Sequence, residues 1–555
     1  MSAPRALFAL ALVAAGSLHA QEGPPGGALY QKLCSQCHGE AGDGKGIAAP
    51  RLLPKPRDFT AGKYKIRHTP SGALPTDDDL RHVIRTGMPY TSMPGWSHLT
   101  DAEIEELVRA VKSFSPDFAN PERLPTPITI PKAPSYSAES AEKGKQVYVE
   151  IGCPACHGEL GRGDGPSAPT LKDDWGNPLR PADLTMRWTY RGGPTREDIY
   201  RTFTTGLNGT PMPSFAESLS DEQRWQLVDF IASLNPEEAP NYAELVQVAF
   251  TTEDLDLARG AELFVDAPQA RFPVVGQITE PGRAFHPAAQ AVEVQALYNP
   301  REIAFLVSWH DLRADTNGHN APDLAVPAEE EAGEVAAAPA EAGGDIWGDA
   351  AATEEGGGDF WGDEGGGSAA PAGGGSEFSD AVAIQLPTQV PAGNRKPYFL
   401  FGDAKNPVDL WFVDLAVKEA RRYTAAGSSA ITTVEGEDVT ATASYDKGKW
   451  SVIFKRSLRA SGGVTFTEGQ YLPIAFSIWD GTSRERGNRR ALTQWMYLYT
   501  LPRVSPSPIG PMLRAGLAVL ALELLLIFAV RRRHARHAVG GVGGNQQPGE
   551  VQAHV

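Results

Sequence analysis

The fold of the first half of this chain is decided by the stretch Cys34-Ser35-Gln36-Cys37-His38. Two cysteines separated by two residues, with histidine directly after the second, are typical of covalent c-type haem attachment. Each thiol adds to one vinyl group of the porphyrin, and the histidine becomes the proximal ligand of the iron. The pattern recurs as Cys153-Pro154-Ala155-Cys156-His157. Half of a zinc site is the alternative, although zinc motifs seldom place histidine directly after the second cysteine.

A methionine follows each motif at the same distance. His38 and Met93 are 55 residues apart (93 − 38), and so are His157 and Met212 (212 − 157). A thioether is a soft ligand for haem iron, and His/Met ligation raises the reduction potential. We therefore predict His38 with Met93, and His157 with Met212, as the axial ligand pairs of two haem c groups. If both irons are six-coordinate, neither has an open position for substrate. This favours electron transfer over catalysis.

The first copy contains a second sulfur, Met88, that competes with Met93 for this role. The matched spacing favours Met93, and Met88 is then interpreted as a packing residue. His68, His82 and His98 are able by their chemistry to replace Met93, but we interpret them as surface or supporting residues.

Both copies show helical signals around their motifs. Capping boxes begin at Thr100 and Ser220, and apolar residues at helical spacing follow. Residues 56–60 match residues 181–185 at an offset of 125, so a six-residue insertion in the second copy is compensated before its methionine. The order of helix, attachment motif, glycine-rich loop, methionine loop and closing helix resembles the class I cytochrome c fold. The resemblance covers residues 24–118 and 138–236 and implies two small all-α domains.

The third region changes from helical to strand patterns. Short alternating runs separated by Gly and Pro predict an antiparallel β-sandwich over residues 242–502. An acidic segment interrupts it at 328–376, with 12 Asp and Glu and no Lys or Arg. Such a composition predicts disorder, because it cannot bury enough apolar area to offset the entropy of ordering. Two Trp-Gly-Asp sequences inside it are either docking elements for a basic partner or part of a solvated insertion.

Several blocks of this third region have a recognisable form. They include residues 294–299, 309–311 (Trp-His-Asp), 380–383 (Asp-Ala-Val-Ala), 406–411 and 475–481 (Ala-Phe-Ser-Ile-Trp-Asp-Gly). The blocks resemble the haem b-binding gamma subunit of ethylbenzene dehydrogenase, whose relatives serve dimethylsulfide dehydrogenase and selenate reductase. The resemblance implies a β-sandwich that holds a non-covalent haem b and exchanges electrons with a periplasmic molybdenum enzyme.

The ligands of such a haem b stay open. That family usually holds its haem b with methionine and lysine, and Met496 is the single methionine of residues 242–502. Neither Met496 nor any particular lysine matches the family ligands. His286 and His310 are alternative iron ligands by their chemistry.

The two ends of the chain predict its location. Arg5 precedes an apolar run that ends in a cleavage-like sequence, which predicts an export signal over residues 1–20. Residues 509–530 are apolar apart from Arg514 and Glu523, and their length suits one transmembrane helix. The basic cluster at 531–536 predicts a cytoplasmic tail over residues 531–555, with the bulk of the chain on the periplasmic side of the cytoplasmic membrane. A buried helix of a soluble domain is the alternative.

Composition excludes some functions. A net charge of −17 argues against nucleic-acid binding, and all four cysteines are used by the two motifs, which leaves none for an iron–sulfur cluster. The sequence therefore predicts a membrane-anchored periplasmic dihaem cytochrome that acts as a non-catalytic electron-transfer subunit of a respiratory oxidoreductase. Its expected partner is a molybdopterin and iron–sulfur enzyme or a quinol-oxidising membrane complex. A dihaem peroxidase, or an electron carrier with a non-haem binding module, are the alternatives.

Overall fold

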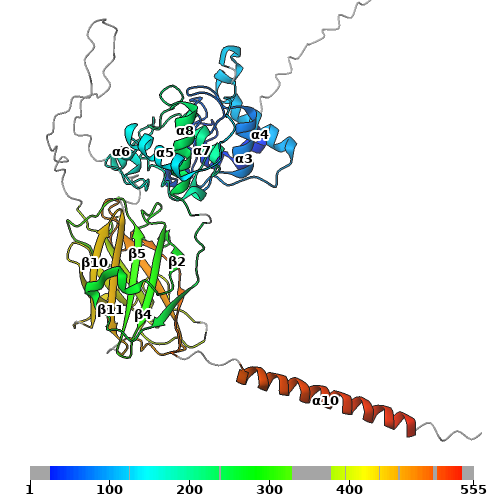
Figure 1. Ribbon diagram of the computed structural model, residues 1–555, viewed down its shortest axis with the longest axis vertical. Helices are drawn as coiled ribbons and strands as arrows, with labels where there is room; N and C mark the ends of the chain where they lie inside the picture. The colour runs from blue at the N-terminus through cyan, green and yellow to red at the C-terminus, as the bar shows by residue number, and fades with distance from the viewer. Residues whose placement is uncertain are drawn as a thin grey trace, which may run out of the picture.

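The computed structural model describes residues 26–123, 126–236, 239–327, 377–393, 395–436, 438–459, 463–503 and 509–539. A helical part, a β-sheet part and one long helix follow each other along the chain and occupy separate regions of space (Figure 1). This confirms the predicted multidomain fold class. The predicted export signal and the predicted disordered acidic segment lie outside the described residues.

The helical part contains two copies of one arrangement. The first copy consists of α1 (Gly27–Leu33), α2 (Ser35–His38), α3 (Asp77–Thr86) and α4 (Asp101–Ser113). The second consists of α5 (Ala138–Glu150), α6 (Pro154–His157), α7 (Arg196–Thr205) and α8 (Asp221–Ser233). Short 3₁₀ helices lie in the connecting loops: η1 (Ala49–Arg51), η2 (Pro116–Ala119), η3 (Pro121–Arg123), η4 (Ala168–Thr170) and η5 (Arg187–Thr189).

Hydrogen bonds at the helix starts explain where the longer helices begin. The side chains of Thr100 and Ser220 accept from the backbone N–H groups of Glu103 and Gln223, as the predicted capping boxes require. Helices α3 and α7, which we did not predict, begin with capping boxes at Thr76 and Thr195. Their signal is a Thr with Asp three residues later, a weaker form of the same pattern.

The β-sheet part is a two-layered sandwich. Its strands are β1 (Leu245–Phe250), β2 (Ala270–Pro273), β3 (Val275–Gly276), β4 (Ala291–Tyr298), β5 (Glu302–His310), β6 (Ala381–Pro387), β7 (Val408–Asp414), β8 (Glu419–Ala425), β9 (Ile431–Thr433), β10 (Val439–Asp446), β11 (Lys449–Ser457), β12 (Tyr471–Trp479), β13 (Ala491–Leu492) and β14 (Met496–Thr500). One layer has the order β10-β11-β5-β4-β1-β14, and the other has the order β12-β6-β7-β8-β9. The 3₁₀ helix η6 (Leu257–Phe264) packs on the outer face of the first layer.

Strand β12 joins the two layers, because its first half pairs with β14 and its second half pairs with β6. The main core lies between the layers, where Phe305 of β5 meets Trp411 of β7 edge-on with ring centroids 5.8 Å apart. The sandwich is mixed rather than fully antiparallel, since β1 runs parallel to both β4 and β14. Residue alternation reports which face of a strand is buried but not the direction of its neighbours, so this difference was not visible in the sequence.

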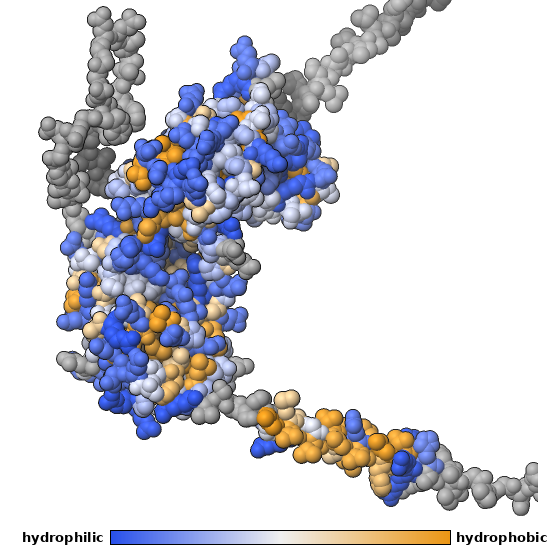
Figure 2. Space-filling model, in the orientation of Figure 1, coloured by the Kyte–Doolittle hydropathy of each residue, from blue (hydrophilic) through white to orange (hydrophobic). Residues whose placement is uncertain are grey.

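Helix α10 (Ile509–Val539) leads away from the sandwich (Figure 1). Residues Ile509–His534 are long and apolar enough to cross a membrane, with a mean hydropathy of 2.3 and no burial against the rest of the described structure. Figure 2 shows this helix as mostly hydrophobic, with hydrophilic residues at its far end. The predicted span at 509–530 lies within it, while its orientation across a membrane stays a prediction.

Candidate haem sites

The two attachment histidines are held in the same way. The Nδ1 atom of His38 lies 2.9 Å from the carbonyl oxygen of Arg57, and Nδ1 of His157 lies 3.0 Å from the carbonyl oxygen of Ala182. An N–H at Nδ1 that donates to a carbonyl leaves the lone pair on Nε2, the atom needed for iron. Burial lowers the pKa of both imidazoles, which favours the neutral form that binds metal.

Within the described structure, the four predicted attachment cysteines form no disulfide and are only partly buried. In each motif the backbone N–H of the second cysteine bonds to the carbonyl of the first, so the two thiols lie one helical turn apart. Burial raises the pKa of Cys34 to about 11 and that of Cys153 to about 12, so both are protonated at neutral pH. Each motif therefore presents two accessible thiols beside one neutral imidazole.

The glycine-rich loop after each motif folds back onto the attachment turn. Gly44 and Gly163 donate to the carbonyls of His38 and His157, at 2.8 and 2.9 Å. Two residues further on, any side chain would collide with this turn. A Cβ on Gly46 would lie 2.3 Å from the carbonyl oxygen of Gln36, and one on Gly165 would lie 2.4 Å from that of Ala155. The backbone can approach the attachment turn this closely only because these positions are glycine.

The methionine loops of the two copies share one backbone arrangement, so Met93 corresponds to Met212. In the second copy, Leu207 donates its N–H to the carbonyl of Met212 at 3.1 Å. In the first copy, Met88 donates to the carbonyl of Met93, also at 3.1 Å. Met88 therefore occupies the position of Leu207, which has no sulfur to offer. This equivalence supports our interpretation of Met88 as a packing residue.

The alternative histidine ligands of the first copy are engaged elsewhere or lie on the surface. His68 Nδ1 lies 2.5 Å from Asp79 Oδ1, and its Nε2 lies 3.2 Å from Arg201 Nη1. His82 and His98 are exposed. The donor set of each copy, two thiols, one neutral imidazole and one thioether, thus fits a haem c.

The two copies are joined through a loop that sequence reasoning missed. The fully buried Arg67 donates to the carbonyls of Thr205 and Gly206, the latter at 3.3 Å. Gly72 donates its N–H to Asn208 Oδ1 at 3.1 Å. Because residues 205–208 lead into the methionine loop of the second copy, the first copy packs directly against the backbone that carries Met212.

The second copy also contacts the sandwich. Arg180 donates to the carbonyl of Ala288 at 3.2 Å and lies 3.5 Å from the hydroxyl of Ser483. Arg162 donates to the carbonyl of Lys447, in the turn between β10 and β11. A cavity of about 420 Å³ lies there, lined by residues between 154 and 166 and by Lys447. The attachment loop of the second copy therefore rests on one end of the sandwich.

The candidate haem b ligands do not come together as a ligand pair. Met496 is 4% exposed and belongs to the packed core between the layers. His310 lies at the end of β5, and its charge interaction with Asp164 places it beside the second copy. His286 interacts with the backbone of Arg51 in the first copy. These three residues therefore do not form a ligand pair for a haem b.

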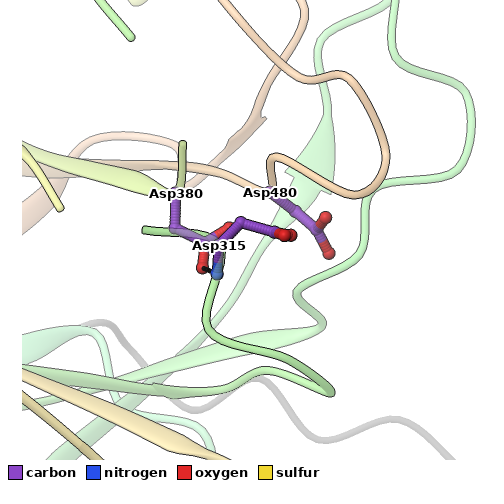
Figure 3. A group of neighbouring side chains, drawn as sticks. All are labelled: Asp315, Asp380 and Asp480. Atoms are coloured by element: carbon purple, nitrogen blue, oxygen red, sulfur yellow. Dashed lines mark hydrogen bonds between the residues drawn. The ribbon is translucent and has the colours of Figure 1, made fainter. Parts of the chain in front are cut away.

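Two motif blocks of the third region, 380–383 and 475–481, meet at a buried group of carboxylates. Asp315, Asp380 and Asp480 place carboxylate oxygens within 4.8 Å of one another (Figure 3). Asp380 accepts hydrogen bonds from the N–H groups of Asp315, Gly481 and the Trp450 ring, at 2.7 to 2.9 Å. Burial and the neighbouring Asp480 raise the pKa of Asp380 to about 8. These two blocks thus connect the loops at this end of the sandwich.

Three family models match separate parts of the chain. Residues 21–109 match the cytochrome c oxidase, cbb3-type, subunit III model, and residues 141–235 match the cytochrome c model. Residues 419–491 match the ethylbenzene dehydrogenase model. These matches confirm both predicted resemblances and favour haem over the zinc alternative.

Two curated relatives share part of the chain. The "Putative respiratory nitrate reductase heme subunit ORF7" of Haloferax mediterranei is 30% identical over 167 residues, 29% of this chain and 58% of that protein. The "Cbb3-type cytochrome c oxidase subunit CcoP" of Azospirillum brasilense is 28% identical over 215 residues, 38% of this chain and 61% of that protein. The chain thus spans about three fifths of the length of each relative. A solved reducing HAO-like protein complex of Kuenenia stuttgartiensis matches at 44% identity over 38% of this chain and 94% of that chain, with a TM-score of 0.36.

Proposed function

We propose that this chain, with its cytochrome c domains followed by a domain like that of ethylbenzene dehydrogenase, is a membrane-anchored dihaem electron-transfer subunit of a respiratory oxidoreductase. One observation carries the proposal. Each copy holds a histidine through a backbone carbonyl, so that Nε2 is left for iron, and each has a methionine 55 residues further on. An iron with two protein ligands has no open position for a substrate, so its role is to accept and release electrons.

The haem groups supply one-electron chemistry when bound. The residues of the chain fix and orient them. Cys34, Cys37, Cys153 and Cys156 would anchor the porphyrins, and the carbonyls of Arg57 and Ala182 orient the histidines that would bind iron. The contacts of Arg67 hold the first copy against the methionine loop of the second, and would thereby hold the two haem sites in a fixed arrangement.

The expected partner is a molybdopterin and iron–sulfur oxidoreductase. The resemblance of the third domain supports this partner, as does the nitrate reductase haem subunit named among the relatives. A quinol-oxidising membrane complex is the alternative partner, supported by the match to a cbb3-type oxidase subunit. Helix α10 would anchor the chain with both cytochrome copies on the periplasmic side, and residues 1–20 would direct its export.

The test is to purify the chain with its partners from membranes and to measure haem, molybdenum and non-haem iron. We expect two covalent haem c per chain, together with molybdenum and additional iron. A chain that matures without covalent haem would overturn the proposal. An intact complex with haem c but without molybdenum would select the quinol-oxidising alternative.

The same material decides two further questions. A pyridine haemochrome spectrum shows whether the sandwich holds a haem b, which the family resemblance implies and the ligand positions do not support. Rapid peroxide turnover by the isolated chain would favour a dihaem peroxidase, which needs an iron that can lose its methionine.

A further inference from the structure

Arg57 touches both candidate haem sites. Its carbonyl oxygen accepts the hydrogen bond from His38 Nδ1 at 2.9 Å. Its guanidinium carbon lies 4.7 Å from the ring centroid of Trp175, in the second copy. A Cβ placed on Gly209 would lie 3.3 Å from Nη1 of Arg57. The guanidinium therefore packs against the backbone three residues before Met212.

The second copy has no equivalent of this side chain. The Pro-Arg pair at 56–57 matches the Pro-Ala pair at 181–182. The carbonyl of Ala182 holds His157 just as the carbonyl of Arg57 holds His38, at 3.0 Å. The backbone of this position is thus shared by both copies, whereas the charge belongs to the first copy alone.

The carboxylates of Asp173, Asp58 and Asp174 raise the pKa of Arg57 through space, although each of them is bonded to other groups. Asp173 accepts hydrogen bonds from the backbone of Trp175 and from Asn177, and Asp174 pairs with Lys63. Within the described residues, no carboxylate forms an ion pair with Arg57. Burial lowers the pKa of Arg57, and burial together with Arg57 and Arg191 lowers the pKa of Lys65 to about 8. The cationic side chains of Arg57, Lys65 and Arg191 therefore lie near one another between the two copies, and Asp173 partly offsets the charges of Arg57 and Lys65.

We propose that Arg57 is a positioning residue shared by both haem sites, which orients His38 through its backbone and places one positive charge beside the second site. The inference rests on the proposed function. Reduction adds an electron to a haem, so a fixed positive charge nearby favours the reduced state. A partly desolvated charge acts more strongly than an exposed one, because water and salt screen it less. Arg57 thus raises the reduction potentials of both haems.

The experiment is a potentiometric titration, followed by visible spectroscopy, of the full chain carrying both haems. Arg57→Ala gives the first copy the residue of the second copy and keeps the carbonyl that binds His38. At a fixed potential, we expect this variant to shift both haems about tenfold towards the oxidised form, which is about 59 mV for a one-electron couple. Arg57→Lys retains the charge and should restore most of the shift.

A matched control removes an arginine that follows the first copy and touches neither site. Arg123 pairs with Asp117 at 2.7 Å on the surface, and Arg123→Ala should leave both potentials unchanged. Unchanged potentials in Arg57→Ala would overturn the inference, as would a shift confined to either one of the two haems. Failure of the proposed function is separate, because it would appear as missing covalent haem in the unaltered chain.

Discussion

The two cytochrome copies share an internal frame but differ in their surroundings. In each copy a buried tyrosine donates to the carbonyl after the attachment histidine: Tyr30 to Gly39 at 2.8 Å, and Tyr148 to Gly158 at 2.6 Å. Nine residues beyond that histidine the copies diverge. Ile47 is 83% exposed in the first copy, whereas its counterpart Pro166 lines the cavity against the sandwich.

This difference separates what a haem requires from what an assembly requires. The hydrogen bonds that hold the histidine and the glycine loop are repeated in both copies. Both predicted haems need an oriented histidine and a backbone loop packed against the attachment turn. The surface around the attachment loop is not repeated. The loop of the second copy rests on the sandwich at Lys447. In the first copy Ile47 is open to solvent, and the contact with the third domain comes later, from Arg51 to Phe285.

The largest expected effect is the loss of one haem at a time. Changing Cys34 and Cys37 to Ser should reduce the covalent haem from two groups per chain to one, because each copy has its own core. The reciprocal change of Cys153 and Cys156 should give the same count. Mass spectrometry of the intact chain and haem staining check this, and loss of both haems from either variant would contradict independent copies.

The next effect distinguishes the two methionines of the first copy. Met93→Ala should leave the first iron without its sixth ligand and convert it to a high-spin form. Its reduction potential should fall by at least about 59 mV, which is a tenfold shift of the redox equilibrium towards the oxidised form. Met88→Leu copies Leu207 of the second copy, so the spectrum and potential should stay unchanged, with a stability cost below about 1.5 kcal/mol. Optical spectra and redox titration test the pair, and the opposite outcome would assign the ligand to Met88.

A pH-dependent effect is expected at the sandwich end on which the second copy rests. Burial raises the pKa of Asp480, and burial with Asp480 raises that of Asp380 to about 8 from an ordinary value of 3.8. The folded state therefore binds these protons more tightly than the unfolded state. This contribution to stability is fully present below about pH 4 and is lost as the pH rises towards 8, at up to about 1.4 kcal/mol per pH unit for one group.

Asp480→Asn removes one of these carboxylates. We expect it to raise the free energy of unfolding more at pH 8 than at pH 5, by about 1 to 3 kcal/mol, because it relieves repulsion between buried charges. Denaturant unfolding followed by tryptophan fluorescence measures this difference. Glu435→Gln, at an exposed position of the same domain, serves as the control and should show no such difference. An equal effect of Asp480→Asn at both pH values would refute the raised pKa values of these buried carboxylates.

The smallest expected effect concerns the contact between the second copy and the sandwich. Arg180→Ala removes the hydrogen bond to the carbonyl of Ala288, a loss of about 1 kcal/mol. Hydrogen exchange in residues 283–290 should accelerate about fivefold, while exchange in the first copy stays unchanged. Unaltered exchange at 283–290 would show that other contacts are sufficient to hold the second copy in place.

Much of the candidate haem sites was predictable from local sequence. The attachment motifs, the 55-residue spacing to Met93 and Met212, and the helix starts at Thr100 and Ser220 all follow from patterns of a few residues. These patterns are readable because covalent attachment and helix capping depend on short-range geometry. The starts of α3 and α7 were missed because Asp, rather than Glu or Gln, completes their capping boxes.

The tertiary structure alone decided how the parts meet. The parallel pairing of β1, the carboxylate group at the end of the sandwich and the reach of Arg57 to the second copy have no local signal. Arg57 is 118 residues from Trp175 (175 − 57) and 152 residues from Gly209 (209 − 57), so their proximity depends on the packing of two complete domains. The sequence by itself determined that each copy can hold a haem, because spacing and residue chemistry are local. Only the fold decided that the two sites share one charge, because that contact exists only once the separate cores have packed together.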